Sequence, residues 1–340
     1  MIVDLFAGPG GWDEGLRLLG VTDALGIELD EAACLTAEAA GHARQRADIA
    51  KTDPLSVAEL LALYGLIGSP PCPGFSAAGK GLGRKDFELL LGAIDMIGAS
   101  FDVDTILDDV RARQHDPRSA LTLEPLRWAL ALQPEWVALE QVPTVLPLWE
   151  AYAPILRGAG YNVWTGNLQA EQYGVPQTRK RALLMASRGH VERPAPTHSH
   201  YYPRSPERLD EGVRKWVSMA DGLDWGMTHR PSMTVTGGGT STGGAEPFGN
   251  AARQGMRREF EAGHWAHRRP STTVSRQNAP GSVRVTVQEA GVLQSFRPDY
   301  PWHGKQGKQF QQVGNAVPPL LAAHILAALG VGDIAKAVAA

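Results

Sequence analysis

Short apolar runs alternate with amphipathic stretches along the first half of the chain. Ile2–Phe6 predicts a buried strand, the glycine-rich residues after it a turn, and Trp12–Leu19 a helix. Ala24–Ile27 predicts a second strand that ends at Glu28, and an alanine-rich helix follows to about Ala40.

The same alternation continues further along. A third strand is predicted before Asp48, and Leu60–Ile67 leads as an apolar run into a proline turn. Pro125–Leu132 predicts a helix and Trp136–Leu139 a strand that ends at Glu140. Strands that alternate with helices predict an α/β fold with a doubly wound, mostly parallel, Rossmann-like sheet.

Two stretches lose this rhythm. Between Lys80 and Arg118 we predict a mobile loop with a helical insertion. From His190 to about Gly281, Pro, Gly, Arg, His and Trp dominate, which predicts a second, smaller, loop-rich domain. Order returns with predicted helices at Thr286–Leu293 and Pro318–Leu329.

Composition places the chain among globular proteins. Of 340 residues, 43% are hydrophobic and 20% charged, enough for a large domain and a smaller one. No apolar run is long enough for a membrane span, and no basic leader precedes the first strand, so we expect a cytoplasmic protein. Cys34 and Cys72 are too few for a disulfide framework or a cysteine-based zinc site. No metal is expected, because His198 and His200 lack further ligands nearby in sequence and are read as part of a linker.

Charge is distributed unevenly along the chain. Residues 177–284 carry 17 Lys/Arg against 9 Asp/Glu, a balance of +8, whereas the whole chain has a net charge of −3. A basic lobe on an acidic body is typical of a protein that faces a polyanion. A solvated basic surface without a partner is the alternative.

Cys72 follows an apolar run that ends in Pro70 and Pro71. Because proline lacks a backbone donor and fixes φ, the strand must end there and Cys72 is presented on a rigid turn. Ligands of α/β sheets bind outside the carboxyl ends of the strands, so the thiol is placed like a nucleophile. The alternative is a small buried apolar side chain.

Three further groups carry candidate chemistry. Glu140 follows four apolar residues, which tends to keep a carboxyl group protonated; a surface glutamate is the alternative. Arg179 and Arg181 lie on one face if a strand begins there, which suits a phosphate or a carbonyl oxygen, although two solvated arginines would look the same. Asn315 lies in a predicted loop that enters the last helix.

The glycine-rich turn after the first strand indicates a cofactor. Glycines at 8, 10 and 11 allow close approach of a ligand, and Glu28 ends the second strand, where ribose hydroxyls are bound in such folds. The full G-x-G-x-x-G pattern is missing, which favours a nucleoside cofactor without a pyrophosphate over a nicotinamide dinucleotide.

Together, in order, these motifs resemble those of the C5-cytosine-specific DNA methyltransferases. The matches are Asp4–Gly11, Pro70-Pro71-Cys72 with Phe75-Ser76, Glu140-Gln141-Val142, Gln177 with Arg179 and Arg181, and Gly314-Asn315-Ala316-Val317. They cover about residues 2–186 and 284–329.

The resemblance implies S-adenosylmethionine as the methyl donor and cytosine C5 in duplex DNA as the acceptor. It implies that Cys72 adds to C6, Glu140 serves N3, Arg181 holds O2 and Arg179 supports the loop, while the target base is flipped out of the helix. The implied cofactor positions are Phe6, Ala7, Gly8, Gly10, Gly11, Glu28, Leu29, Asp48, Ile49, Pro70, Leu121, Asn315 and Ala316. The implied substrate positions are Pro71, Ser76 and Gln177.

By the same resemblance, residues 1–186 and 285–340 form the catalytic domain, 187–284 form the target-recognition domain, and the stretch from Gly79 to Arg118 is a lid. A prokaryotic or phage-encoded enzyme with a cognate restriction endonuclease as partner is implied, and the oligomeric state stays open. The chain departs from the family at Pro73, where glutamine is usual, at Gln141, where asparagine is usual, and at Leu29, where an aromatic residue is frequent. The loop after Cys72 is also about thirty residues longer than in compact members.

Three other readings remain at this point. A tRNA cytosine-5 methyltransferase would keep the chemistry and change the substrate. A catalytically silent DNA-binding relative would lack turnover, although Cys72, Glu140 and both arginines are all present. A nicotinamide-dependent dehydrogenase fits the glycine pattern least well.

Overall fold

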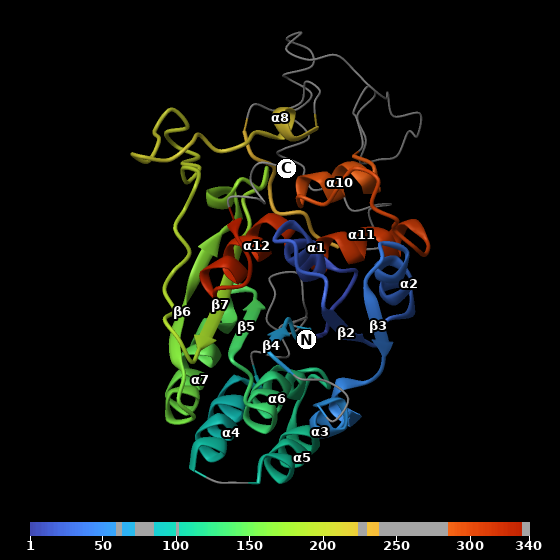
Figure 1. The fold of residues 1–340 in the computed structure, drawn as a ribbon, viewed down its shortest axis with the longest axis vertical. Coiled ribbons are helices and arrows are strands. Elements are labelled where there is room, and N and C mark those ends of the chain that lie inside the picture. Colours follow the sequence, from blue (N-terminus) through green and yellow to red (C-terminus); the bar gives the residue numbers. More distant parts are fainter. Residues whose placement is uncertain (59–62, 72–84, 100–101, 224–229, 238–284, 335–340) are drawn as a thin grey trace.

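The computed structural model describes residues 1–58, 63–71, 85–99, 102–223, 230–237 and 285–334. Within these ranges, a mixed sheet has the order β3-β2-β1-β4-β5-β7-β6 (Figure 1). Its strands are β1 (Ile2–Leu5), β2 (Ala24–Glu28), β3 (Ala43–Arg46), β4 (Gly65–Gly68), β5 (Trp136–Gln141), β6 (Asn162–Gln169) and β7 (Lys180–Ser187). β1 to β5 are parallel, and β7 is antiparallel to both of its neighbours. The predicted doubly wound, mostly parallel sheet is confirmed.

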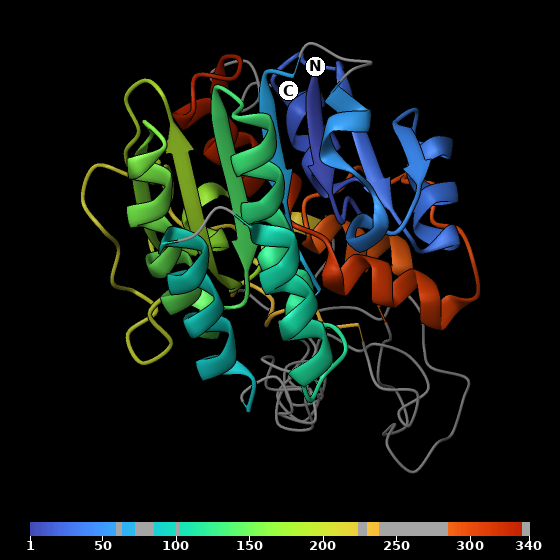
Figure 2. The ribbon, with the colours of Figure 1, turned by 90° about the horizontal axis from the view of Figure 1, so that it is seen from below.

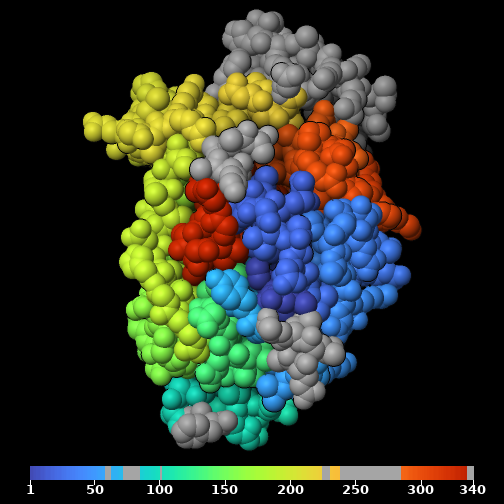
Figure 3. Space-filling model, in the orientation of Figure 1, coloured from blue at the N-terminus to red at the C-terminus, as the bar shows by residue number. Residues whose placement is uncertain are grey.

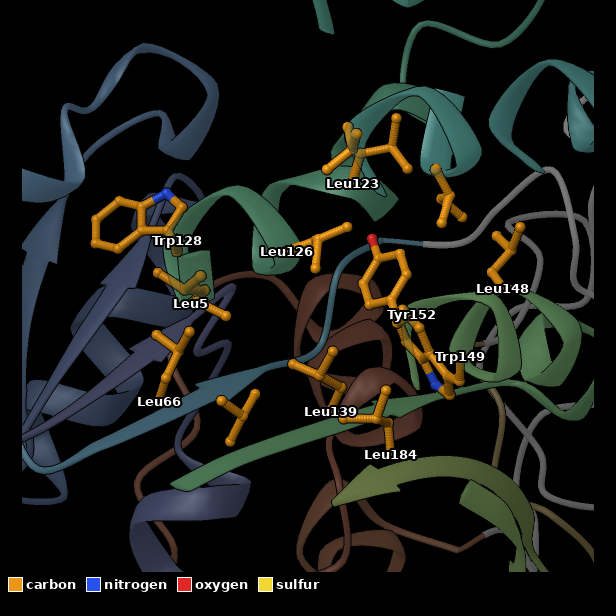
Figure 4. Packing of buried hydrophobic residues seen from close by; sticks show 14 of the residues in the cluster. Leu5, Leu66, Leu123, Leu126, Trp128, Leu139, Leu148, Trp149, Tyr152 and Leu184 are labelled. Carbon is orange, nitrogen blue, oxygen red and sulfur yellow. The ribbon is translucent and has the colours of Figure 1, made fainter. Parts of the chain in front are cut away.

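Helices cover both faces of this sheet (Figures 1 and 2). Side chains of α4 (Phe87–Ala99), α5 (Val103–Arg113), α6 (Glu124–Leu132) and α7 (Leu146–Gly158) share one apolar cluster with the strands. Figure 4 shows Leu5, Leu66 and Leu139 of the sheet facing Leu126 and Tyr152 in this cluster.

On the other face, the first and last helices pack against each other. α1 (Gly11–Leu18) and α12 (Pro319–Ala328) contribute to a second apolar cluster. A Cβ at Gly15 would lie 2.6 Å from the Cβ of Ala322, and one at Gly11 would lie 2.2 Å from the carbonyl oxygen of Val317. Glycine is therefore required at both positions for the two helices to approach this closely.

The stretch predicted as a mobile lid is helical over its described part. Leu90 and Ile94 of α4, and Leu107 and Val110 of α5, are buried in the first apolar cluster. Arg111 donates to Glu124 of α6 at 2.6 Å. The predicted helical insertion is therefore present as α4 and α5, whereas the prediction of a mobile loop is wrong for Phe87–Ala99 and Val103–Arg113, because these helices are packed parts of the core.

A third apolar cluster lies at the end of the molecule that the later part of the segment 188–223 reaches (yellow at the top of Figure 3). This segment is mostly irregular, as predicted, and ends in α8 (Met219–Leu223). Met219 and Val235 pack with Leu293 of α10 (Val287–Leu293) and Phe310 of α11 (Gln306–Asn315). This cluster crosses the predicted domain boundary at residues 284 and 285, so the two sides share a core there.

The remaining helices position the loops. α2 (Glu31–Ala39) connects β2 to β3, and α3 (Pro54–Ala58) precedes β4. Among the described residues, no helix combines the length and apolarity that a membrane crossing requires.

Candidate active site

A cleft of about 820 Å³ opens at the carboxyl ends of the parallel strands. It lies where β1 pairs with both β2 and β4, the point at which the strand order reverses. Ligands of open α/β sheets bind at such a switch point. The predicted site residues that line it are Phe6, Ala7, Gly8, Gly11, Glu28, Leu29, Asp48, Ile49, Pro70, Pro71, Leu121, Glu140, Arg179, Arg181, Asn315 and Ala316.

The loop after β1 forms one wall of the cleft. Phe6 has φ of 59°, and Gly8 and Gly10 have φ of 56° and 107°, so the backbone turns through the left-handed region three times. Glu28 fixes this loop, because its carboxylate accepts from the backbone N–H of Gly8 at 2.9 Å and from that of Leu29 at 2.7 Å. Glu28 also accepts from the backbone N–H of Asp30 at 2.7 Å, so about one of the four acceptor positions of the carboxylate remains for a hydroxyl group of a ligand.

The opposite end of the same wall is formed by the segment after β3. Asp48 accepts from the backbone N–H of Ala50 at 3.1 Å, which caps the short 3₁₀ helix η1 (Ile49–Lys51) and leaves its side chain on the cleft. Ile49 is buried beside it, and Leu121 comes from the 3₁₀ helix η3 (Ser119–Leu123). Leu29 is 60% exposed, so this wall offers apolar surface to a ligand.

Glu140 and Arg181 meet on the other side of the cleft. Glu140 lies near the end of β5, and its Oε1 is 2.8 Å from Nε of Arg181 in β7. Burial raises the pKa of Glu140, and Arg181 and Arg179 only partly oppose this effect. The pair thus combines a carboxyl group that holds its proton longer than usual with a cation that faces the same space.

Arg179 shares the face but has a different task. Its side chain is buried and donates to the carbonyl oxygens of Val235 at 3.1 Å, Gly314 at 2.9 Å and Ala316 at 3.1 Å. The guanidinium therefore joins β7 to the segment before residue 238 and to the end of α11.

Gln141 links the loop after β5 to the turn after β4. Its Nε2 donates to the carbonyl oxygen of Pro70, and its Oε1 accepts from the backbone N–H of Val142. The chain has glutamine where asparagine was expected, and the longer side chain still makes a direct connection.

Asn315 and Ala316 reach the cleft from a different element than predicted. Gln306–Asn315 is the helix α11, so Asn315 is a helix C-terminus and the expected loop is only the short turn before α12. The helix was missed because its buried positions include Gln312, which donates to the carbonyl oxygen of His303, and Gly314.

Among the described residues, two predicted site residues do not line the cleft. Gln177 is fully buried; its amide donates to Leu293 and Gln294 and accepts from the backbone N–H of Val235. The structure therefore assigns Gln177 to the link between the start of β7 and α10 rather than to substrate contact. Gly10 faces Tyr300 instead of the cleft.

Cys72 and Ser76 lie outside the described residues. Pro71, the residue that precedes Cys72, lines the cleft. The part of the predicted lid at residues 79–84 and most of the predicted recognition domain, residues 238–284, also lie outside the described part of the chain.

Some cleft residues had no distinctive sequence signal. Arg118 lines the cleft and is held by Asp116 through Nε at 2.9 Å and Nη2 at 3.0 Å, and Ser69 accepts from Trp12 at 2.9 Å. His200 is 3.0 Å from Glu171 and belongs to the packing behind η5 (Ala170–Tyr173). No group of three His, Cys, Asp or Glu within the described ranges is arranged to hold a metal ion.

Comparison with known proteins agrees with this geometry. The family model described as C-5 cytosine-specific DNA methylase matches residues 1–100 and 109–330. The chain is 27% identical to the type II methyltransferase M1.HphI of Haemophilus parahaemolyticus, over 96% of this chain and 86% of that protein. It is 25% identical to the type II methyltransferase M.HgiDI of Herpetosiphon aurantiacus, over 96% and 93% of the two chains.

Solved structures share the fold. The S. pombe Dnmt2 methyltransferase superposes with a TM-score of 0.59 at 16% identity, covering 96% of this chain and 97% of that one. The Entamoeba histolytica methyltransferase EhMeth superposes with a TM-score of 0.60 at 14% identity, with the same coverage. The family model matches most of the chain. This match shows that the chain belongs to the C-5 cytosine-specific DNA methylase family and is a DNA (cytosine-5-)-methyltransferase.

Proposed function

We propose that this enzyme methylates C5 of a cytosine flipped out of a specific duplex DNA sequence, through a covalent bond between Cys72 and C6. The observation that carries the proposal is that Glu140 and Arg181 face the same cleft as Glu28 and Asp48. One cleft thus has a side suited to a nucleoside cofactor and a side suited to a base.

The cofactor side fits S-adenosylmethionine. Glu28 accepts a hydrogen bond from a ribose hydroxyl, Asp48 accepts from the adenine amino group, and Phe6, Ile49 and Leu121 provide apolar walls. Gly8 lines the cleft with a positive φ, so the loop backbone borders the cofactor without a side chain in the way. Bound there, S-adenosylmethionine supplies an electrophilic methyl group.

The base side fits an activated cytosine. The thiolate of Cys72 forms a bond to C6, while Glu140 gives a proton to N3, so that electron density moves to C5 and makes it nucleophilic. Arg181 holds the carbonyl oxygen O2 and keeps Glu140 oriented. After methylation, C5 gives its proton to water, and the electrons of that C–H bond restore the C5=C6 double bond as the Cys72–C6 bond breaks and releases the thiolate. N3 then returns its proton to Glu140.

The positions of three loops support this division of labour. Gln141 ties the Glu140 loop to Pro70, two residues before Cys72, and Arg179 ties β7 to Ala316. Basic residues of the segment 187–284 contact DNA phosphates and a subset reads base edges, in keeping with the charge of that part of the sequence. The names of the type II relatives support a cognate restriction endonuclease as partner.

Trapping with 5-fluorocytosine tests the covalent step. Duplexes of randomised sequence, with every cytosine replaced by 5-fluorocytosine, are incubated with enzyme and S-adenosylmethionine. Because fluorine at C5 cannot leave as a proton does, we expect a denaturant-resistant adduct with the wild type and none with Cys72→Ser. Cys34→Ser, which changes the buried cysteine of α2, is the matched control and keeps the adduct.

Two outcomes would contradict the proposal. If wild-type enzyme binds DNA and cofactor without forming the adduct, the chain is a silent relative. If the adduct forms on tRNA that contains 5-fluorocytosine and not on any duplex, the substrate is RNA.

A further inference from the structure

The loop from Phe6 to Gly11 needs external support. Phe6 adopts φ of 59°, a conformation that is strained for a non-glycine residue and persists only where its surroundings hold it. Two backbone N–H groups of the loop have partners: that of Ala7 donates to the carbonyl oxygen of Ile27 at 3.2 Å, and that of Gly8 donates to the carboxylate of Glu28 at 2.9 Å. These bonds hold only the side of the loop next to β2.

Tyr300 holds the other side of this loop. Its hydroxyl donates to the carbonyl oxygen of Pro9 at 2.5 Å, across 291 positions of the sequence. A Cβ at Gly10 would lie 2.7 Å from the same hydroxyl oxygen. A side chain at position 10 would collide with Tyr300, so glycine is required there. The position faces Tyr300 and therefore does not line the cleft.

The tyrosine itself is rigidly placed. It is 2% exposed, and its ring centroid lies 4.7 Å from that of Phe296 and 4.8 Å from that of Trp302. Burial and the nearby Glu14 and Asp13 raise the pKa of Tyr300, so its hydroxyl remains a donor throughout the physiological range. The third apolar cluster, which contains Tyr300, also contains Met219 and Val235, residues on the recognition side of the chain.

We propose that Tyr300 is a positioning residue of the cofactor site, holding the Gly8–Gly11 turn in its binding conformation and joining it to the core that includes Met219 and Val235. The inference rests on the proposed binding of S-adenosylmethionine in the cleft. Without the hydroxyl, the turn samples more conformations, and cofactor binding must then order it at a cost in conformational entropy. The affinity for the cofactor therefore falls, whereas the rate of the chemical step is unchanged because its catalytic groups are still present.

Tyr300→Phe tests this role, because it removes one hydroxyl without changing the ring. Tyr161→Phe is the matched control, since Tyr161 is 4% exposed and its hydroxyl donates to the carbonyl oxygen of Pro134 at 2.6 Å, outside the cleft. Both variants lose one buried hydrogen bond to a backbone carbonyl, so both are expected to lose similar thermal stability.

Two measurements separate positioning from stability. Binding of S-adenosylhomocysteine is followed by calorimetry, and methylation of duplex DNA by steady-state kinetics. We expect Tyr300→Phe to raise the Kd of S-adenosylhomocysteine and the KM of S-adenosylmethionine about fivefold to tenfold, with kcat within twofold of wild type. Tyr161→Phe is expected to leave all three constants unchanged.

The inference is overturned if Tyr300→Phe gives the same Kd and KM as wild type or as Tyr161→Phe. It is also overturned if kcat falls while KM stays constant, because that result would place the effect in the chemical step. Failure of the proposed cofactor assignment looks different, since wild-type enzyme would then not bind S-adenosylhomocysteine at all, and failure of the covalent step leaves this binding intact and shows only in the 5-fluorocytosine experiment.

Discussion

Two buried groups of carboxylates and arginines occupy the sheet, and they serve different purposes. The β5 cluster consists of Glu140, Arg179 and Arg181, and the β1 cluster of Asp4, Asp13 and Arg44. Burial raises the pKa of Glu140 and, more strongly, that of Asp4. All members of the β5 cluster line the cleft, whereas none of the β1 cluster does. A shifted pKa therefore reports burial, and only access to the cleft separates a catalytic acid from a structural one.

The β1 cluster is built by the register of three strands. Asp4 pairs with Gly26, which pairs with Arg44, so the three residues lie side by side on one face of the sheet. A Cβ at Gly26 would lie 2.4 Å from Nη1 of Arg44, so the missing side chain lets the guanidinium cross the sheet. There its Nη2 donates to Asp13 at 2.7 Å. The arginine thereby anchors the first turn of α1 to β3.

The variant Arg44→Met gives the most direct test of the difference between the two clusters. Because Arg44 is fully buried and pairs with Asp13, its removal leaves a buried carboxylate without its cation. We expect a loss of about 3–5 kcal/mol in the free energy of unfolding, measured by urea denaturation. Arg181→Met is expected to lose clearly less stability, since Arg181 is partly exposed to the cleft and Glu140 can take up a proton. Equal losses would show that the two clusters do not differ in role.

Glu140→Gln makes the complementary test on activity. We expect kcat to fall by about 10²-fold or more, because the side chain can no longer give a proton to N3. Asp4→Asn is the matched change in the β1 cluster and is expected to keep kcat within about threefold, a limit of about 0.7 kcal/mol. Rates of methyl transfer to duplex DNA at saturating cofactor measure both. A comparable fall in Asp4→Asn would contradict the assignment of Asp4 to structure.

The link between the β5 cluster and the turn before Cys72 gives a smaller effect. Gln141→Leu removes the hydrogen bond to Pro70, and we expect kcat to fall about threefold to tenfold, as for one lost hydrogen bond. Gln309→Leu removes a bond to the carbonyl oxygen of Trp302, 2.8 Å in length, and serves as the control outside the cleft. If both variants turn over like the wild type, the link has no catalytic importance.

The smallest expected effect is the pH dependence of stability that Asp4 of the β1 cluster causes. The pKa of Asp4 is raised well above 3.8, so the folded state favours the protonated form. The contribution of Asp4 to the stability of the folded state is therefore fully present below about pH 3.8. It is lost as the pH rises through the pKa that Asp4 has in the folded protein. Asp4→Asn removes this loss, and we expect its Tm relative to wild type to rise by about 2 °C or more between pH 5 and pH 8. A constant difference in Tm over this range would contradict the raised pKa.

The ends of β2 and β5 were predictable from the sequence because the apolar run of each strand stops at a glutamate. Glu28 and Glu140 were placed within one residue of their strand ends on that basis. A helical insertion was predicted where α4 and α5 lie, but without their bounds or their packing, and α11 was not predicted, because its buried face includes the amide side chain of Gln312. Arg111 of that insertion, for example, is part of α5, but its partner Glu124 belongs to α6.

The division of labour inside the site was less predictable. Sequence alone shows that Gln177, Arg179 and Arg181 are polar, but not which of them opens to the cleft. That depends on the register of β7 and on carbonyl oxygens more than a hundred residues away, such as those of Leu293 and Gly314. Gly10 was likewise identified as part of the turn, while the tyrosine that requires it lies near the other end of the chain.

The close packing of α1 on α12 has a consequence for biosynthesis. Every residue of the β5 cluster has been translated by position 181, yet Gly11, at the end of the turn after β1, packs on Val317, and Gly15 of α1 packs on Ala322, both much later in the sequence. A nascent or prematurely terminated polypeptide that already contains Cys72, Glu140 and Arg181 would therefore lack one wall of the cleft, so that activity begins only once α12 has been translated.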